Sequence, residues 1–105
     1  MRRLELQREA VEEIAEAASW YAEQRLGLDR ELLDEIERIL ADVESGPRAF
    51  PPVENISGDL DLRRALLRRF PYSILFLVMQ EEIRVVALAH SRRRPGYWTG
   101  RLAEG

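Results

Sequence analysis

The sequence has 105 residues and contains no cysteine, no lysine and a single histidine, His90. Without cysteine the chain can form no disulfide, no thiolate metal site and no cysteine nucleophile, which fits a reducing compartment. The longest apolar run, residues 74–79, is far shorter than the ~20 residues that a membrane-spanning helix needs. No apolar stretch follows the early arginines, so we expect no signal peptide. These absences predict a cytoplasmic protein that does not enter a membrane.

The charge of the chain is divided unevenly. Residues 1–62 carry 16 acidic and 7 basic side chains, a net charge of −9, whereas residues 63–105 carry 3 acidic and 9 basic side chains, a net charge of +6. All 16 basic residues are arginine, so each can bind a carboxylate or phosphate through two hydrogen bonds. Two interpretations stay open: a solvated acidic helical face beside an arginine-rich sheet, or a basic surface that binds an anionic partner.

The first half of the chain has the pattern of a strand and two helices. Residues 3–7 alternate between polar and apolar, as a half-buried strand does. Apolar residues then recur at spacings of three and four, which predicts a helix that ends near Gly27. Its buried stripe is expected to contain Val11, Ile14, Ala15, Ala18, Tyr21 and Ala22. A second helix is predicted from an Asp29 N-cap to residue 45, and the short connection makes the two helices antiparallel.

The second half predicts a loop over residues 46–58 and a three-stranded antiparallel meander over residues 62–69, 72–79 and 83–90. The first of these strands alternates poorly, as edge or bulged strands do, and the second is almost continuously apolar, as central strands are. In the third, one face should hold Ile83, Val85, Ala87 and Ala89. We therefore predict a single α+β domain over residues 1–105. Both helices should pack on one sheet face, and basic strand residues should occupy the open face.

Two segments of the meander point to a known family. They are LLRRFPYSILFLV, residues 66–78, and EIRVVALAHSRRRPGYW, residues 82–98. With these segments after a helical hairpin, the chain resembles the RelE/ParE superfamily of bacterial toxins, whose members are also known as plasmid stabilisation proteins. The resemblance covers essentially the whole chain. It implies the toxin half of a type II toxin–antitoxin module, which forms a complex with a cognate antitoxin whose C-terminal segment wraps the toxin.

The resemblance leaves two targets open. RelE-like members cut messenger RNA on the ribosome, whereas ParE-like members inhibit DNA gyrase. RNA cleavage without a metal needs a base, an acid and cations that stabilise the developing charge, and His90, Arg92 and Arg93 could supply these groups if the chain is an endoribonuclease. The set has no lysine and is less dense than in RelE-like nucleases. The ParE-like side is therefore favoured, with no metal or cofactor expected, and an inactive paralogue that only binds its antitoxin is a third alternative.

For either target we expect a surface that binds an anionic partner, such as an acidic, amphipathic antitoxin segment. The candidate residues are Arg68, Arg69, Arg92, Arg93, Arg94, Tyr97 and Trp98. These arginines should converge on one concave surface. Structural roles are the alternative: His90 would fix the backbone, Arg68 or Arg69 would pair with helix carboxylates, and Trp98 would pack the tail onto the core. Trp20 and Tyr21 are adjacent on a helix and cannot both face inward, so one of them is expected at an interface.

Overall fold

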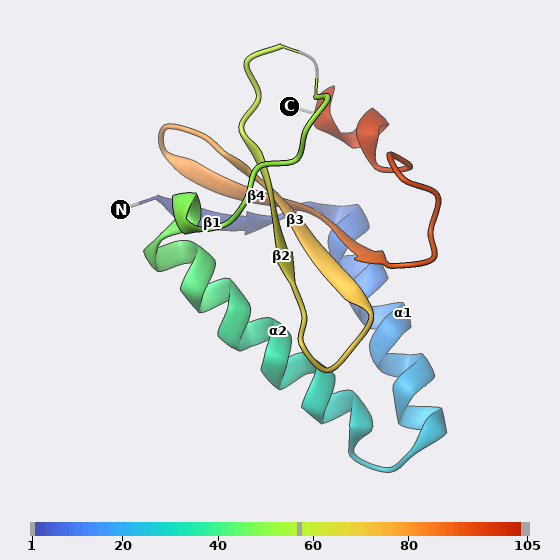
Figure 1. Ribbon diagram of the computed structural model, residues 1–105. Helices are drawn as coiled ribbons and strands as arrows, with labels where there is room; N and C mark the ends of the chain where they lie inside the picture. Colours follow the sequence, from blue (N-terminus) through green and yellow to red (C-terminus); the bar gives the residue numbers. More distant parts are fainter. Residues whose placement is uncertain (1, 57, 104–105) are drawn as a thin grey trace.

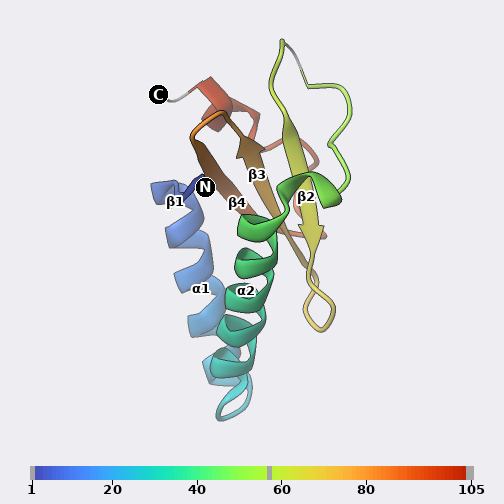
Figure 2. The same cartoon turned by 90° about the vertical axis from the view of Figure 1, so that its left-hand side faces the viewer.

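The computed structural model describes residues 2–56 and 58–103. Its elements are β1 (Arg3–Leu6), α1 (Arg8–Gln24), α2 (Leu28–Ser45), the short helix η1 (Pro47–Ala49), β2 (Leu62–Leu66), β3 (Tyr72–Val78), β4 (Glu82–His90) and the short helix η2 (Thr99–Ala103). The strands form one mixed sheet in the order β1-β4-β3-β2, in which β1 runs parallel to β4. Both long helices lie on one side of the sheet (Figures 1 and 2). The predicted α+β fold is confirmed, and the N-terminal strand forms one edge of the sheet.

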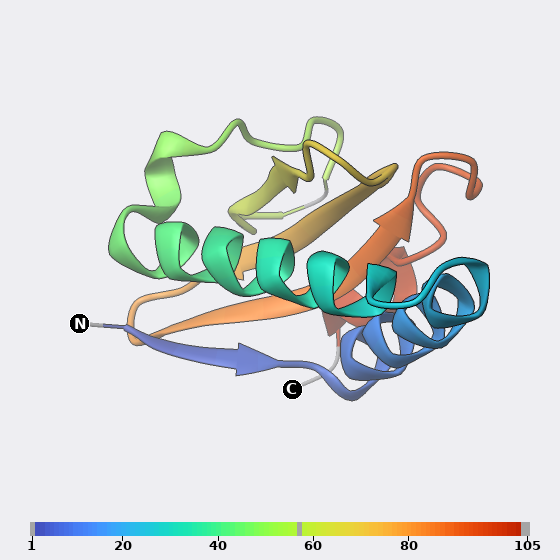
Figure 3. The ribbon, with the colours of Figure 1, turned by 90° about the horizontal axis from the view of Figure 1, so that it is seen from below.

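The helical hairpin buries a narrower stripe of α1 than the sequence predicts. The inward-facing residues are Ala10, Ile14, Ala17 and Tyr21. Val11 is instead 49% exposed, and Ala15 and Ala22 are also exposed. The alanine-rich helix has two apolar stripes, and only one of them can face α2 and the sheet. The turn between the two helices lies beyond the β2–β3 turn (Figures 1 and 2), and α2 crosses in front of the strands when the molecule is seen from below (Figure 3).

The second helix begins one residue earlier than its expected cap. Gly27 is the N-cap residue of α2 and has φ of 87°, a left-handed conformation that glycine adopts at no steric cost. Asp29 therefore lies in the first turn, where its carboxylate still faces the positive end of the helix dipole, and does not cap the helix. Within the described residues, no helix combines the length and the apolar character that crossing a bilayer requires.

A β-bulge in β4 decides which of its side chains face the helices. The register against β3 shifts between Leu75 and Phe76, which leaves Val86 as an extra residue on β4. The core on the helical side receives Ile83, Val85 and Leu88. The opposite face receives Val86, Ala87 and Ala89. The prediction that Ala87 and Ala89 share a face with Ile83 is therefore wrong, because the inserted residue reverses the alternation.

The sheet face away from the helices is apolar and covered, so the prediction of an open basic face is also wrong. Its buried residues are Leu62, Leu75, Leu77, Val86, Ala87 and Trp98. The tail after β4 packs Tyr97 and Leu102 against this cluster, and the loop before β2 adds Val53 and Ile56.

The loop between η1 and β2 is held against the edge of the sheet. The N–H of Val53 donates to the carbonyl of Leu62 at 2.8 Å, and the N–H of Arg64 donates to the carbonyl of Pro51 at 3.1 Å. The predicted edge position of the first meander strand is confirmed, and this loop partly satisfies its outer backbone groups. The strand ends at Leu66, three residues earlier than predicted.

Candidate functional site

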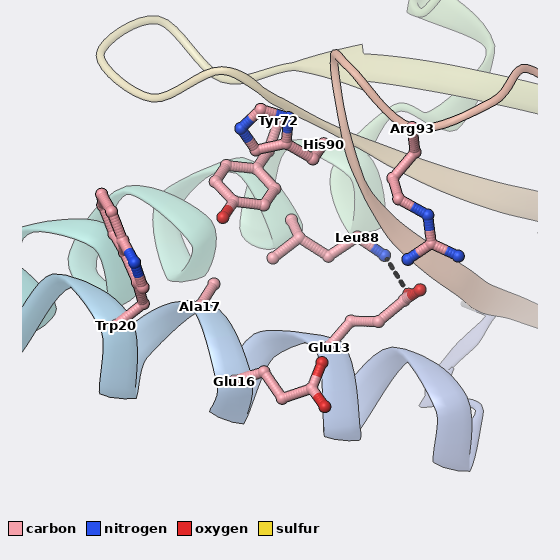
Figure 4. Close-up of a pocket in the computed structure, with 8 residues that line it drawn as sticks. All are labelled: Glu13, Glu16, Ala17, Trp20, Tyr72, Leu88, His90 and Arg93. Atoms are coloured by element: carbon pink, nitrogen blue, oxygen red, sulfur yellow. Dashed lines mark hydrogen bonds between the residues drawn. The ribbon is translucent and has the colours of Figure 1, made fainter.

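His90 lies at the end of β4, where three pockets meet. One, of about 170 Å³, lies between α1 and the sheet and is called the helical-side pocket (Figure 4). The second, of about 210 Å³, lies on the opposite sheet face and is called the arginine pocket. The third, of about 590 Å³, is called the aromatic cleft. Together they bring residues of α1, three strands and the tail to one end of the sheet.

The imidazole of His90 fixes the turn that follows β4. Its Nδ1 accepts a hydrogen bond from the N–H of Arg92 at 3.0 Å, and its carbonyl accepts one from the N–H of Arg93 at 3.0 Å. The ring lies edge-on to that of Tyr72, its cross-strand partner, with centroids 5.0 Å apart. An Nδ1 that accepts a hydrogen bond carries no proton, so the neutral ring holds its proton on Nε2.

The arginine pocket holds three guanidinium groups and no carboxylate. Arg64, Arg93 and Arg94 line it together with Ser73 and Ser91. None of these three arginines forms an ion pair within residues 2–56 and 58–103. Unpaired guanidinium groups beside hydroxyl groups are suited to binding a carboxylate or phosphate.

Arg64 was missed by the sequence analysis. It lies on β2 two residues after Leu62, so both side chains face the sheet surface that is opposite the helices. Leu62 and Ala65 are three residues apart on one strand and so point to opposite faces, which places Arg64 on the face of Leu62. The exposed Leu66, which shares the face of Leu62, made the alternation unclear.

Glu13, on α1, holds the tail against the sheet. Its carboxylate accepts hydrogen bonds from the backbone N–H of Leu88 at 3.0 Å and from the hydroxyl of Tyr97 at 2.7 Å. Arg101 binds both of its oxygens, each at 2.9 Å. Burial, together with the hydrogen bond to Glu13, raises the pKa of Tyr97, and the hydrogen bond to Glu13 raises the pKa of Arg101. Both side chains therefore remain donors at neutral pH.

Arg93 connects this network to the pockets. Its guanidinium carbon lies 3.8 Å from the centre of the Tyr97 ring, in a cation–π contact. The same side chain lines both the helical-side pocket and the arginine pocket. Figure 4 shows it extending from the tail toward Glu13. The guanidinium of Arg93 therefore stacks on a ring whose hydroxyl is bound to Glu13.

The aromatic cleft combines exposed aromatic surface with one arginine. Trp20 is 55% exposed, and its ring lies edge-on to that of Tyr21 with centroids 4.9 Å apart. Tyr21 turns inward, and its ring lies 5.0 Å from that of Phe70. The expectation that only one of the pair faces inward is confirmed. Arg92 completes the cleft and has no ion-pair partner in the described chain.

The structure does not bring Arg68 and Arg69 into these pockets. Both follow the end of β2, and their backbone N–H groups donate to the carboxylate of Glu35 on α2. The guanidinium of Arg69 forms an ion pair with Glu31, also on α2. The predicted convergence of all these arginines on one concave surface is therefore wrong for Arg68 and Arg69, which line none of the three pockets: Glu35 binds both backbones, and Glu31 binds the guanidinium of Arg69.

Trp98 is a core residue. Its side chain is 7% exposed and belongs to the apolar cluster on the face opposite the helices. The ring is thus placed to pack the tail onto the sheet, the structural alternative considered above. Tyr97 beside it is half-buried, with its hydroxyl bound to Glu13.

Comparison with known proteins gives the family. A family model described as the ParE toxin of the type II toxin–antitoxin system parDE matches residues 4–95. Among solved structures, the chain is similar to one described as "Chromosomal ParDE TA system from P. aeruginosa", with a TM-score of 0.69 and 17% sequence identity over 86% of this chain and 96% of that chain. No curated protein matches it. Since the family match spans the helical hairpin and the whole meander, the chain belongs to the ParE toxin family of type II toxin–antitoxin systems.

Proposed function

We propose that this toxin stops bacterial growth by binding DNA gyrase in the cytoplasm and that a cognate antitoxin neutralises it. Membership of the ParE toxin family supports the toxin–antitoxin pairing. Under this proposal the chain acts through its surface and makes or breaks no covalent bond. The choice between gyrase and RNA rests on the state of the side chains around His90.

The observation that supports a binding role is that groups required for RNA cleavage already have structural partners. His90 uses Nδ1 to hold the N–H of Arg92. The Tyr97 hydroxyl donates to Glu13 and its pKa is raised by burial, so it is a poor proton donor to a leaving group. Trp98 is 7% exposed, so little of its ring is available for a base to stack on, although it lines the arginine pocket. By contrast, Arg64, Arg92 and Arg94 have no ion-pair partner among the described residues.

The same surface suits an acidic, amphipathic antitoxin segment. An apolar or aromatic side chain of that segment would enter the aromatic cleft beside Trp20. Neighbouring carboxylates of the segment would bind Arg92 in the cleft and the arginines of the arginine pocket, which lies on the other side of His90. None of the residues lining that pocket or the cleft is acidic, so charge complementarity favours such a segment.

The test is to induce the chain in a bacterial host without its antitoxin. Double-strand breaks in DNA and filamentous cells before any fall in protein synthesis would support gyrase as the target. An immediate stop in translation with intact DNA would overturn it. Normal growth of cells that contain the folded chain would indicate the inactive paralogue.

Ribosome-dependent endoribonuclease activity is the second candidate, and one feature favours it. His90, Arg93, Arg94 and the hydroxyls of Ser73 and Ser91 line the same pocket. In this arrangement Nε2 of His90 would exchange a proton with the RNA while the arginines bind the phosphate. His90→Asn keeps an acceptor for the turn but cannot transfer a proton, so it separates the two candidates.

A further inference from the structure

We infer that Glu13 is a positioning residue that sets the side chain of Arg93 for binding an acidic protein partner. The inference rests on the proposed function for the identity of that partner, the antitoxin. The position of the Arg93 side chain is a property of the toxin without a partner, so it can be measured before any binding experiment.

The first support is the number of donors that meet at one carboxylate. Glu13 receives hydrogen bonds from the backbone of β4, from Tyr97 and from Arg101. Its side chain is only 12% exposed and that of Arg101 17%. Arg101 also donates to the carbonyl of Val86 at 3.0 Å. Hydrogen bonds to a charged group that is largely shielded from water hold their geometry better than surface ion pairs do.

The second support is the connection from Glu13 to Arg93 through one ring. The hydroxyl of Tyr97 is fixed by Glu13, and the guanidinium of Arg101 lies 5.1 Å from the centre of the same ring. Arg93 lies 3.8 Å from that centre. The ring therefore has a fixed orientation, and Arg93 stacks on it at the boundary between two pockets.

The third support is the charge balance. Arg101 binds both oxygens of Glu13 and so offsets the charge of one of the two carboxylates, Glu13 and Glu16, that line the helical-side pocket with Arg93 (Figure 4). Arg93 has no ion pair among the described residues, and its guanidinium stacks on the neutral Tyr97 ring. One arginine is used for structure so that the other stays available for a partner.

The position of Arg93 can be measured directly by NMR. The ring current of Tyr97 should shift the side-chain protons of Arg93 upfield. In Glu13→Gln the upfield shift of these protons should fall to less than about half of its wild-type size, because a neutral amide binds the Tyr97 hydroxyl and the Arg101 guanidinium less strongly than a carboxylate does. Glu12→Gln, on an exposed neighbouring site of α1, should leave them unchanged. If Glu13→Gln folds poorly, Tyr97→Phe keeps the ring, removes only the hydroxyl, and should show a smaller displacement change in the same direction.

Antitoxin affinity then distinguishes an effect of Glu13 on the position of Arg93 from an effect on the stability of the fold. In a double-mutant cycle with the antitoxin encoded in the same module, Glu13→Gln should weaken binding about tenfold when Arg93 is present and less than about twofold when Arg93 is alanine. Equal losses in both backgrounds would overturn the inference, as would unchanged Arg93 shifts in Glu13→Gln. If the wild-type chain binds no antitoxin, the proposed function fails, and the NMR result alone decides whether Glu13 sets Arg93.

Discussion

The buried carboxylate of Glu35 accepts a 3.3 Å hydrogen bond from the backbone N–H of Arg69 and a second bond from that of Arg68. Glu35 is 2% exposed. It lies on α2, whereas the two arginines follow the end of β2. This one side chain thus ties the helical layer to the β2–β3 connection.

Glu35→Ala should lower the free energy of unfolding by about 3 kcal/mol, because two backbone donors lose their acceptor and a cavity forms. Glu35→Gln should cost less, since its amide oxygen still accepts a hydrogen bond. Urea denaturation followed by circular dichroism measures both. Glu37→Ala, at an exposed position of the same helix, is the control and should change stability by less than about 0.5 kcal/mol. Equal effects at the two positions would contradict the role of Glu35.

Trp20→Ala should weaken antitoxin binding about 10- to 100-fold, as expected for an aromatic anchor in an interface. The stability of the free toxin should change little, because the side chain is 55% exposed. Isothermal titration calorimetry gives the affinity. Leu26→Ala is the matched control, since Leu26 is 96% exposed and does not line the cleft. An unchanged affinity in Trp20→Ala would exclude the aromatic cleft as an antitoxin site.

Arg64→Gln and Arg94→Gln should each weaken antitoxin binding about 5- to 10-fold and reduce its dependence on salt, because each removes a cation that faces the partner's carboxylates. Titrations at two salt concentrations measure both effects. Arg30→Gln removes an exposed arginine from α2, away from the arginine pocket, and should behave like the wild type. A uniform loss in all three variants would indicate that only net charge matters.

The ion pairs of Glu31 predict a dependence of stability on pH. Hydrogen bonds from Arg69 and then Arg25 lower the pKa of Glu31 below its ordinary value of 4.5. The unfolded chain therefore binds this proton more readily, so the stabilisation is fully present above pH 4.5 and is lost as the pH falls through the lower pKa of the folded state.

Glu31→Gln should thus be less stable than the wild type at neutral pH, and the difference should shrink below pH 4.5. Thermal unfolding at neutral and acidic pH compares the two proteins. High salt should also reduce the difference, because the carboxylate is accessible to solvent. If the difference in stability between the wild type and Glu31→Gln is the same at neutral and acidic pH, the ion pairs of Glu31 contribute nothing.

Local patterns in the sequence predicted most of the elements, because helix and strand periodicities depend on neighbouring residues. The order of elements and the edge position of β2 followed from them. The faces of β4 did not, because the bulge at Val86 depends on its register against β3. Likewise the alanines of α1 form two equivalent stripes, and only packing decides that Ala10 and Ala17 are buried.

The candidate site was predicted in part. The arginine run and His90 do lie together at one end of the sheet. Long-range pairs were missed, because Glu13 meets Arg101 across 88 residues and no local signal marks such a partner. The same applies to Arg69, whose partner Glu31 is 38 residues away. Only the folded chain shows which cations have a partner within the molecule and which do not.

The most direct test of the central claim compares the purified wild-type toxin with His90→Asn in two assays. One measures supercoiling by DNA gyrase, and the other measures cleavage of messenger RNA on ribosomes. We predict that the wild type inhibits supercoiling and that His90→Asn does so within about threefold, because the proposed binding role requires no proton transfer by His90. Neither protein should cleave messenger RNA on the ribosome. The account would be contradicted if the wild type cleaves messenger RNA, His90→Asn does not, and neither protein affects supercoiling.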